Sequence, residues 1–96
     1  MPTYIALMNW TNDGIAQVKD SPKRLAAGRK LFKKLGVKLK DTYLTMGRYD
    51  LVCILEAPDD ETFARAMLTL GSRGASRSET LRAFNEAEYR RIIDSV

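Results

Sequence analysis

The sequence contains no histidine and a single cysteine, and both shortages limit the chemistry that the chain can perform. Without histidine, a protein lacks the commonest general base, the usual catalytic triad and imidazole metal ligands. One cysteine, Cys53, can form neither an internal disulfide nor a thiolate metal cluster, and its aliphatic neighbours favour a small buried side chain over a nucleophile. We therefore expect the chain to need no metal and no cofactor.

Long hydrophobic runs are also missing. The apolar stretch near the N-terminus, residues 4–8, is too short for the core of a signal peptide, and no basic region precedes it. We expect no membrane association and a cytoplasmic location, which the single cysteine also fits. The chain has 96 residues, of which 45% are hydrophobic and 29% charged, and this composition predicts one globular domain spanning residues 1–96.

Positive charge is concentrated in one segment of the chain. Residues 19–40 contain nine basic residues and one acidic residue, Asp20, whereas the rest of the sequence is net negative. A nucleic-acid interface would interleave such a segment with aromatic side chains, and Phe32 is the only aromatic residue there. We interpret the segment as the solvated face of a helix and do not expect a nucleic-acid partner.

Alternating and helical patterns predict the order of helices and strands. The first strand, residues 3–10, is apolar on both faces, and Ser21 and Pro22 are typical of a helix start. Gly36 is a plausible end for that helix. The full set in order is a strand at 3–10, a turn at 11–14, a helix at 21–35, a strand at 37–46, a tight reversal at 47–48, a strand at 49–56, a helix after 59–61, a polar loop at 71–78, a strand at 80–84 and a last helix opened by a capping box of Asn85 and Glu88.

This order predicts an α+β fold, the ferredoxin-like βαββαβ sandwich with an added C-terminal helix. Two helices would cover one face of the sheet. Because the strands at 3–10 and 49–56 are apolar on both sides, we expect the other face to pack against a second copy. The result would be a homodimer or higher homo-oligomer that closes a dimeric α/β barrel.

Several short blocks resemble the GYD-domain family, and together they cover nearly the whole chain. The blocks are Trp10-Thr11, Gly14-Ile15, Lys19-Asp20-Ser21-Pro22, Gly47-Arg48-Tyr49-Asp50, Glu56-Ala57-Pro58-Asp59-Asp60 and Thr80-Leu81-Arg82-Ala83-Phe84. The resemblance implies a ferredoxin-like, dimeric α/β-barrel fold, and it implies little about function. The loop at residues 71–77 departs from the Asn-Val-Arg-Thr kind of sequence associated with this family.

Two polar segments invite a binding interpretation that the sequence supports weakly. The acidic residues 59–61 could bind a hard cation, but carboxylates at a helix N-terminus are stabilised by the helix dipole. Gly71, Gly74 and the nearby arginines could hold a phosphate, yet they match neither a Walker loop nor a dinucleotide fingerprint.

Polar and aromatic residues from all four strands form the candidate ligand site: Trp10, Tyr43, Thr45, Tyr49, Asp50 and Arg82. We expect Met8 and Trp10 to face the open side of the sheet together with Tyr43 and Thr45. Such an arrangement would make a shallow aromatic cavity, with Arg82 binding an organic anion.

The positions of Tyr49 and Asp50 in that cavity are left open, because the parity of their strand is ambiguous. Each candidate also has a structural interpretation. Trp10 could anchor a dimer interface, and Asp50 could accept backbone amides at the hairpin or pair with Arg48 or Arg82.

Three kinds of function fit these residues. We favour a homo-oligomeric binding module for a small organic anion or aromatic molecule. The alternative is a cofactor-independent enzyme, similar to a monooxygenase or isomerase, with Asp50 as base or Tyr49 as acid, which rests on analogy of fold. The third candidate is a purely structural or partner-binding protein.

Overall fold

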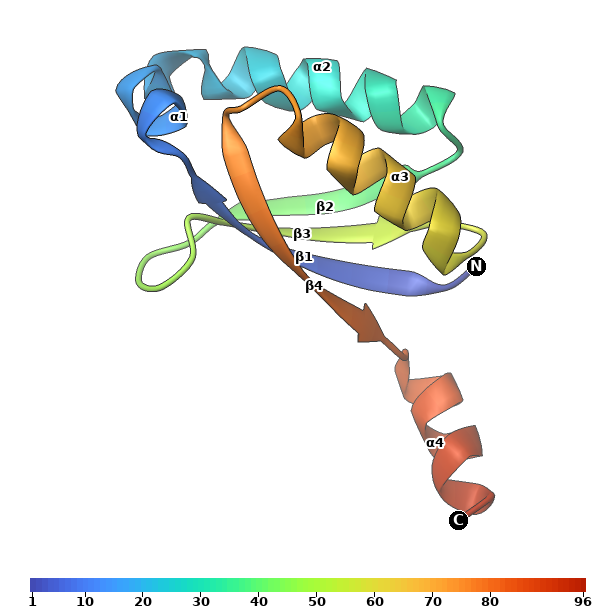
Figure 1. Ribbon diagram of the computed structural model, residues 1–96. Coiled ribbons are helices and arrows are strands. Elements are labelled where there is room, and N and C mark those ends of the chain that lie inside the picture. Colours follow the sequence, from blue (N-terminus) through green and yellow to red (C-terminus); the bar gives the residue numbers. More distant parts are fainter.

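The computed structural model describes residues 1–96 and shows a four-stranded antiparallel sheet with two long helices on one face (Figure 1). The elements are β1 (Thr3–Trp10), α1 (Asn12–Ala16), a 3-10 turn η1 (Val18–Asp20), α2 (Ser21–Lys34), β2 (Lys38–Leu44), β3 (Leu51–Glu56), α3 (Asp60–Gly71), β4 (Ser76–Ala83) and α4 (Glu86–Asp94). The strands lie in the order β2-β3-β1-β4. The predicted ferredoxin-like α+β fold is confirmed; each chain by itself is an open sheet and not a closed barrel.

Local signals explain where the helices begin. At α3 the Asp59 carboxylate accepts the backbone N–H of Thr62 at 2.8 Å, and this hydrogen bond lowers the pKa of Asp59. At α4 the predicted capping box is confirmed, because Asn85 and Glu88 each accept the other's backbone N–H at 2.9 Å. Gly36 follows α2 with φ +87°, the left-handed conformation that ends a helix.

Two turns differ from the sequence-based expectation. The predicted turn at residues 11–14 is instead the start of α1, because the Thr11 hydroxyl accepts the backbone N–H of Gly14 and caps a short helix. The predicted tight reversal at residues 47–48 is instead a longer loop, residues 45–50, which connects the end of β2 to the start of β3. Gly47 in this loop has φ +108°, which explains the glycine.

The register of the antiparallel pairs decides which side chains face the helices. On β1, Ala6 and Met8 pair with Cys53 and Leu51 of β3, and this row lies beneath the helices. The alternate row, in which Leu7 pairs with Val52, lies on the open face. β1 and β3 are the central strands, whereas β2 is an edge strand.

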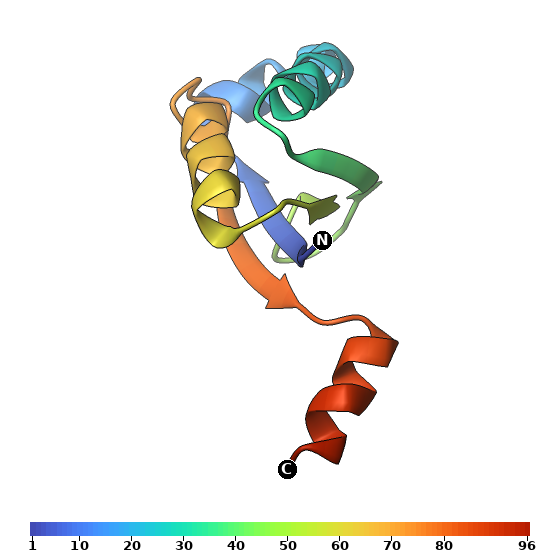
Figure 2. The same ribbon diagram turned by 90° about the vertical axis from the view of Figure 1, so that its right-hand side faces the viewer.

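Figure 2 shows the two long helices on one side of the sheet, and the hydrophobic core lies between these two layers. Phe32 of α2 and Phe63 of α3 are both buried against the helix-facing row. Phe63 stacks on Tyr4 with ring centroids 4.1 Å apart. Cys53 is buried in this core, as the sequence predicts. None of the helices has both the length and the apolar character needed to cross a membrane.

Candidate functional site

The six residues of the predicted ligand site do not form one cluster. Trp10 and Arg82 belong to the helix-facing row, since Arg82 pairs with Tyr4 on that row and Trp10 follows Met8 two residues later. Tyr43 pairs with Val52 and lies on the open face with 57% of its surface exposed. The expectation that Met8 and Trp10 face the open side is therefore wrong. Both faces of β1 are apolar, so alternation alone could not choose between them.

Asp50 and Thr45 lie in the loop between β2 and β3, where they bind backbone groups. The Asp50 carboxylate accepts the backbone N–H of Trp10 at 2.9 Å, and the Asp50 N–H donates to the carbonyl of Met8 at 2.8 Å. The Thr45 hydroxyl donates to the carbonyl of Tyr49 at 2.6 Å. These bonds fasten the loop to the end of β1, which matches the structural interpretation of Asp50.

Tyr49 points toward the open face. Its hydroxyl donates to the carboxylate of Glu79 at 2.6 Å, and Glu79 pairs with Leu7 on the open-face row. This hydrogen bond holds the phenol in its neutral form and raises the pKa of Tyr49. Arg48 lies over the Tyr49 ring at 5.7 Å from its centroid.

Arg82 is part of a packed group at the other end of the sheet. Its guanidinium lies 5.5 Å from the centroid of the Tyr4 ring and 4.5 Å from that of Phe84, and it donates to the carbonyl of Ala83. The Tyr4 hydroxyl donates to Asp60 at 2.5 Å. Burial first, and then the Asp60 carboxylate, raise the pKa of Tyr4 to about 12. Arg82 is thus held far along β1 from Trp10, and the two do not share a cavity.

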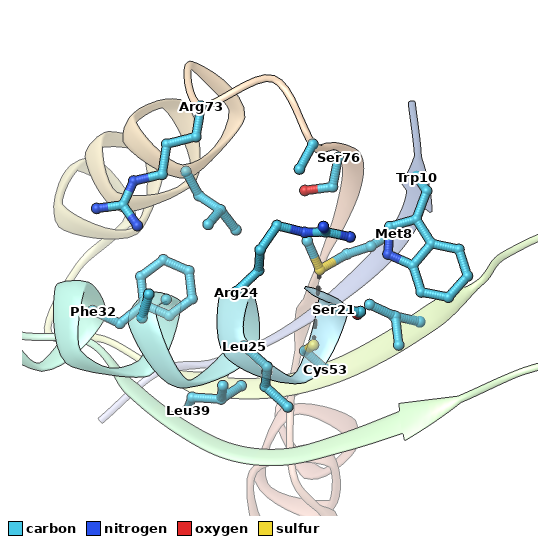
Figure 3. Close-up of a pocket in the computed structure, with 15 residues that line it drawn as sticks. Met8, Trp10, Ser21, Arg24, Leu25, Phe32, Leu39, Cys53, Arg73 and Ser76 are labelled. Atoms are coloured by element: carbon cyan, nitrogen blue, oxygen red, sulfur yellow. Dashed lines mark hydrogen bonds between the residues drawn. The ribbon is translucent and has the colours of Figure 1, made fainter. Parts of the chain in front are cut away.

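A cavity that the sequence does not reveal lies beneath α2, between this helix, the sheet and the end of α3 (Figure 3). Its volume is about 130 Å³ and ten of its fifteen lining residues are hydrophobic. Trp10 forms part of the wall, so one predicted ligand residue does contact a cavity, on the opposite face of the sheet from the one expected. The polar lining residues are Ser21, Arg24, Arg73 and Ser76.

A close contact between α1 and the loop before β4 lies next to this cavity, whose lining includes Ala75 and Arg24. A Cβ atom added to Gly14 would lie 1.9 Å from the carbonyl oxygen of Ala75, so only glycine fits there. Thr11 bonds the same loop, with its N–H donating to Ala75 and its hydroxyl to Gly74. Arg24 of α2 then donates to the carbonyl of Gly14 at 3.1 Å. The sequence carries little signal for this contact beyond Gly14 itself and Gly28, a second glycine inside a helix.

Two apolar surfaces remain uncovered. The first is the open face of the sheet, whose central residues are Ile5, Leu7, Val52, Ile54 and Leu81. The second is the α4 stripe, made of the apolar residues Tyr89, Ile92 and Ile93 of the C-terminal helix together with Val96, which lies two residues beyond the end of that helix. Helix α4 projects away from both the sheet and the other helices (Figures 1 and 2). No three histidine, cysteine or carboxylate side chains are grouped in a way that could hold a metal ion.

Comparisons with known proteins match this chain over most of its length. The family profile described as GYD domain matches residues 4–93. A protein of Thermus thermophilus, named glutamine synthetase and cystathionine beta-lyase binding protein, is 39% identical over 89 residues, which are 92% of this chain and 94% of that protein.

Two solved structures share the fold. The crystal structure of TTHA0845 from Thermus thermophilus superposes with a TM-score of 0.56 at 25% identity, over 88% of this chain and 95% of that chain. The crystal structure of the hypothetical protein PHS023 from Pyrococcus horikoshii superposes with a TM-score of 0.56 at 19% identity, over 90% of this chain and 93% of that chain. The likeness to the Pyrococcus protein supports the fold alone.

Proposed function

This chain belongs to the GYD-domain family, and we propose that it is a protein-binding protein whose α4 stripe attaches to partner enzymes. One observation carries the proposal. Every residue of α4 except Glu88 is exposed, although the helix has a continuous apolar side. An uncovered apolar surface on a folded helix favours a second protein as its occupant.

The geometry of α4 suits insertion into an apolar groove. Tyr89, Ile92 and Ile93 are spaced at i, i+3 and i+4, the pattern by which helices place anchors in the groove of a partner, and Val96 follows just after the helix ends. Their exposed fractions are 57%, 40%, 53% and 100%. The capping box, together with an Arg90–Glu86 ion pair at 2.7 Å, stabilises the helix before it binds, which lowers the entropy cost of docking.

The kind of partner comes from the 39% identical relative, whose name states that it binds glutamine synthetase and cystathionine β-lyase. The family match extends to residue 93 and so includes most of α4. We carry the partner class, metabolic enzymes, over to this chain as part of the proposal. The other apolar surface, the open sheet face, is left for self-association.

We assign the open face to a second copy of the same chain, as the sequence predicts. Its apolar centre is bordered by charged side chains of both signs, including Lys38, Asp41, Arg77 and Glu79. In a twofold-symmetric dimer, the positive side chains of one copy can lie against the negative side chains of the other. A face with charges of only one sign would instead repel a second copy. Two sheets packed in this way would close the dimeric α/β barrel.

The two other predicted functions have less support. A ligand site on the open face is weakened because Trp10 and Arg82 lie on the opposite side of the sheet. An enzyme with Asp50 as base is weakened because one oxygen of that carboxylate already accepts the Trp10 amide. A small-molecule role therefore depends on the cavity beneath α2.

The test is a binding measurement with α4 variants. The double substitution Ile92→Ser and Ile93→Ser removes two anchors from the stripe, and we expect it to weaken binding to glutamine synthetase or cystathionine β-lyase from the same cells by about tenfold or more. The matched control, Ala87→Ser with Arg91→Ser, introduces the same two serines on the opposite side of α4 and lowers helix propensity at least as much. We expect the control to bind like the unaltered chain.

Two results would contradict the proposal. One is equal affinity of the Ile92→Ser/Ile93→Ser chain and the unaltered chain for the enzyme. The other is the absence of binding between the unaltered chain and either enzyme at micromolar concentration.

A further inference from the structure

The cavity beneath α2 is a recess in the packing that opens partly to solvent. Side chains usually fill such a space between a helix and a sheet, so a volume of about 130 Å³ needs an explanation. The space exists because α2 carries Gly28 where it crosses the sheet. A Cβ atom added to Gly28 would meet only the Leu70 Cδ1 atom, at 3.7 Å. The lining is mostly apolar and includes Leu25 of α2 and Leu51 of β3.

The charge around the cavity has one sign. Its lining contains two arginines and no acidic residue. Arg24 is held in place by the carbonyls of Gly14 and Gln17, at 3.1 and 2.9 Å, and Figure 3 shows it extending from α2 toward Met8 and Trp10. Because these carbonyl groups carry no net charge, they do not neutralise the positive charge of Arg24.

Arg73 adds a second charge from the loop after α3 (Figure 3). Its guanidinium forms none of the ion pairs and side-chain hydrogen bonds within the chain. Ser21 and Ser76 contribute hydroxyl groups to the same lining. An apolar space bordered by the free guanidinium of Arg73 and by hydroxyls suits an apolar molecule with an anionic end, since a guanidinium binds a carboxylate with two parallel hydrogen bonds.

We propose that the cavity beneath α2 binds a small monocarboxylate, with its apolar body under α2 and its carboxylate paired with Arg73. Arg24 supplies additional fixed positive charge. An engineered apolar cavity of about 150 Å³ in another protein holds benzene, so a body of about six carbon atoms suits a cavity of about 130 Å³.

Trp10 gives a direct readout, because it is the only tryptophan and it lines the cavity. The probe is 4-methylpentanoate, and its neutral counterpart is 4-methylpentan-1-ol. We expect the carboxylate to change Trp10 fluorescence saturably at millimolar or lower concentration, and the alcohol to bind about tenfold more weakly. Arg73→Gln should weaken the carboxylate about tenfold and leave the alcohol unchanged.

Gly28→Leu tests the location by filling the space, with Gly28→Ala as its matched control. We expect Gly28→Leu to abolish the fluorescence change and Gly28→Ala to keep it, since the added Cβ fits. Nuclear Overhauser contacts between the probe and the Leu25 and Leu51 methyl groups would place the ligand in the unaltered chain, independently of how the variants fold.

Any of three results would overturn the proposal. They are no saturable change with the carboxylate, equal affinity for carboxylate and alcohol, and probe contacts with the open-face residues Leu7 and Val52 instead of the cavity.

Discussion

The carboxylate of Asp50 accepts the backbone N–H of Trp10 at 2.9 Å, forty residues away along the chain. This bond joins the β2–β3 loop to the last residue of β1, where the strand would otherwise leave an unpaired amide. The bond explains structurally why the segment at residues 47–50 ends in aspartate: Asp50 fastens the β2–β3 loop to Trp10, which lines the cavity.

Removal of the Asp50 carboxylate should therefore destabilise the fold. We expect Asp50→Ala to lower the free energy of unfolding by about 1–3 kcal/mol, since a partly buried amide loses a charged acceptor. Asp50→Asn keeps an acceptor oxygen and should lose less. Urea denaturation measures both, and unchanged stability of Asp50→Ala would contradict this role.

A methyl group at Gly14 should also destabilise the chain. Its Cβ would lie 1.9 Å from the Ala75 carbonyl oxygen, so α1 and the loop before β4 must separate. We expect Gly14→Ala to cost about 1–3 kcal/mol in thermal or chemical denaturation. Gly71→Ala is the matched control, because nothing lies within 4 Å of an added Cβ there, and it should be neutral or stabilising. Equal effects of the two substitutions would refute the close contact.

Alkaline pH should weaken the fold through Tyr4. The folded state raises the pKa of Tyr4 from 10.0 to about 12, so the folded chain keeps a proton that the unfolded chain releases. The stabilisation is complete below pH 10.0 and is lost as the pH rises toward about 12. Unfolding of the Tyr4→Phe variant should lack this part of the pH dependence, and identical alkaline slopes for the two proteins would contradict it.

The open sheet face should control the oligomeric state. We expect the unaltered chain to sediment as a dimer and Ile54→Lys, which places a charge at the centre of that face, to sediment as a monomer. Leu68→Lys is the control, because Leu68 is 75% exposed on α3 and lies away from the open face. A monomeric unaltered chain at micromolar concentration would rule out the dimer.

The fold could be predicted from the sequence because its signals are local. The Asp59 carboxylate and the Asn85–Glu88 box each mark a helix start by hydrogen bonds within three residues, and at α2 the restricted backbone of Pro22 in the first turn does so without a side-chain cap. Alternation located the strands to within a few residues for the same reason.

The site could not be predicted in the same way, because it depends on how distant elements meet. β1 is apolar on both faces, so only the register with β3 and β4 shows that Trp10 faces the helices. The cavity needs Gly28 of α2 and Arg73 of the loop after α3, two residues whose proximity no local pattern indicates.

Backbone hydrogen exchange in the presence of glutamine synthetase tests the central claim most directly. If the α4 stripe is the docking element, the amides of Glu86–Asp94 should exchange more slowly in the complex than in the free chain, while those of α3 stay unchanged. A complex that forms and leaves exchange in α4 unaltered would contradict the account.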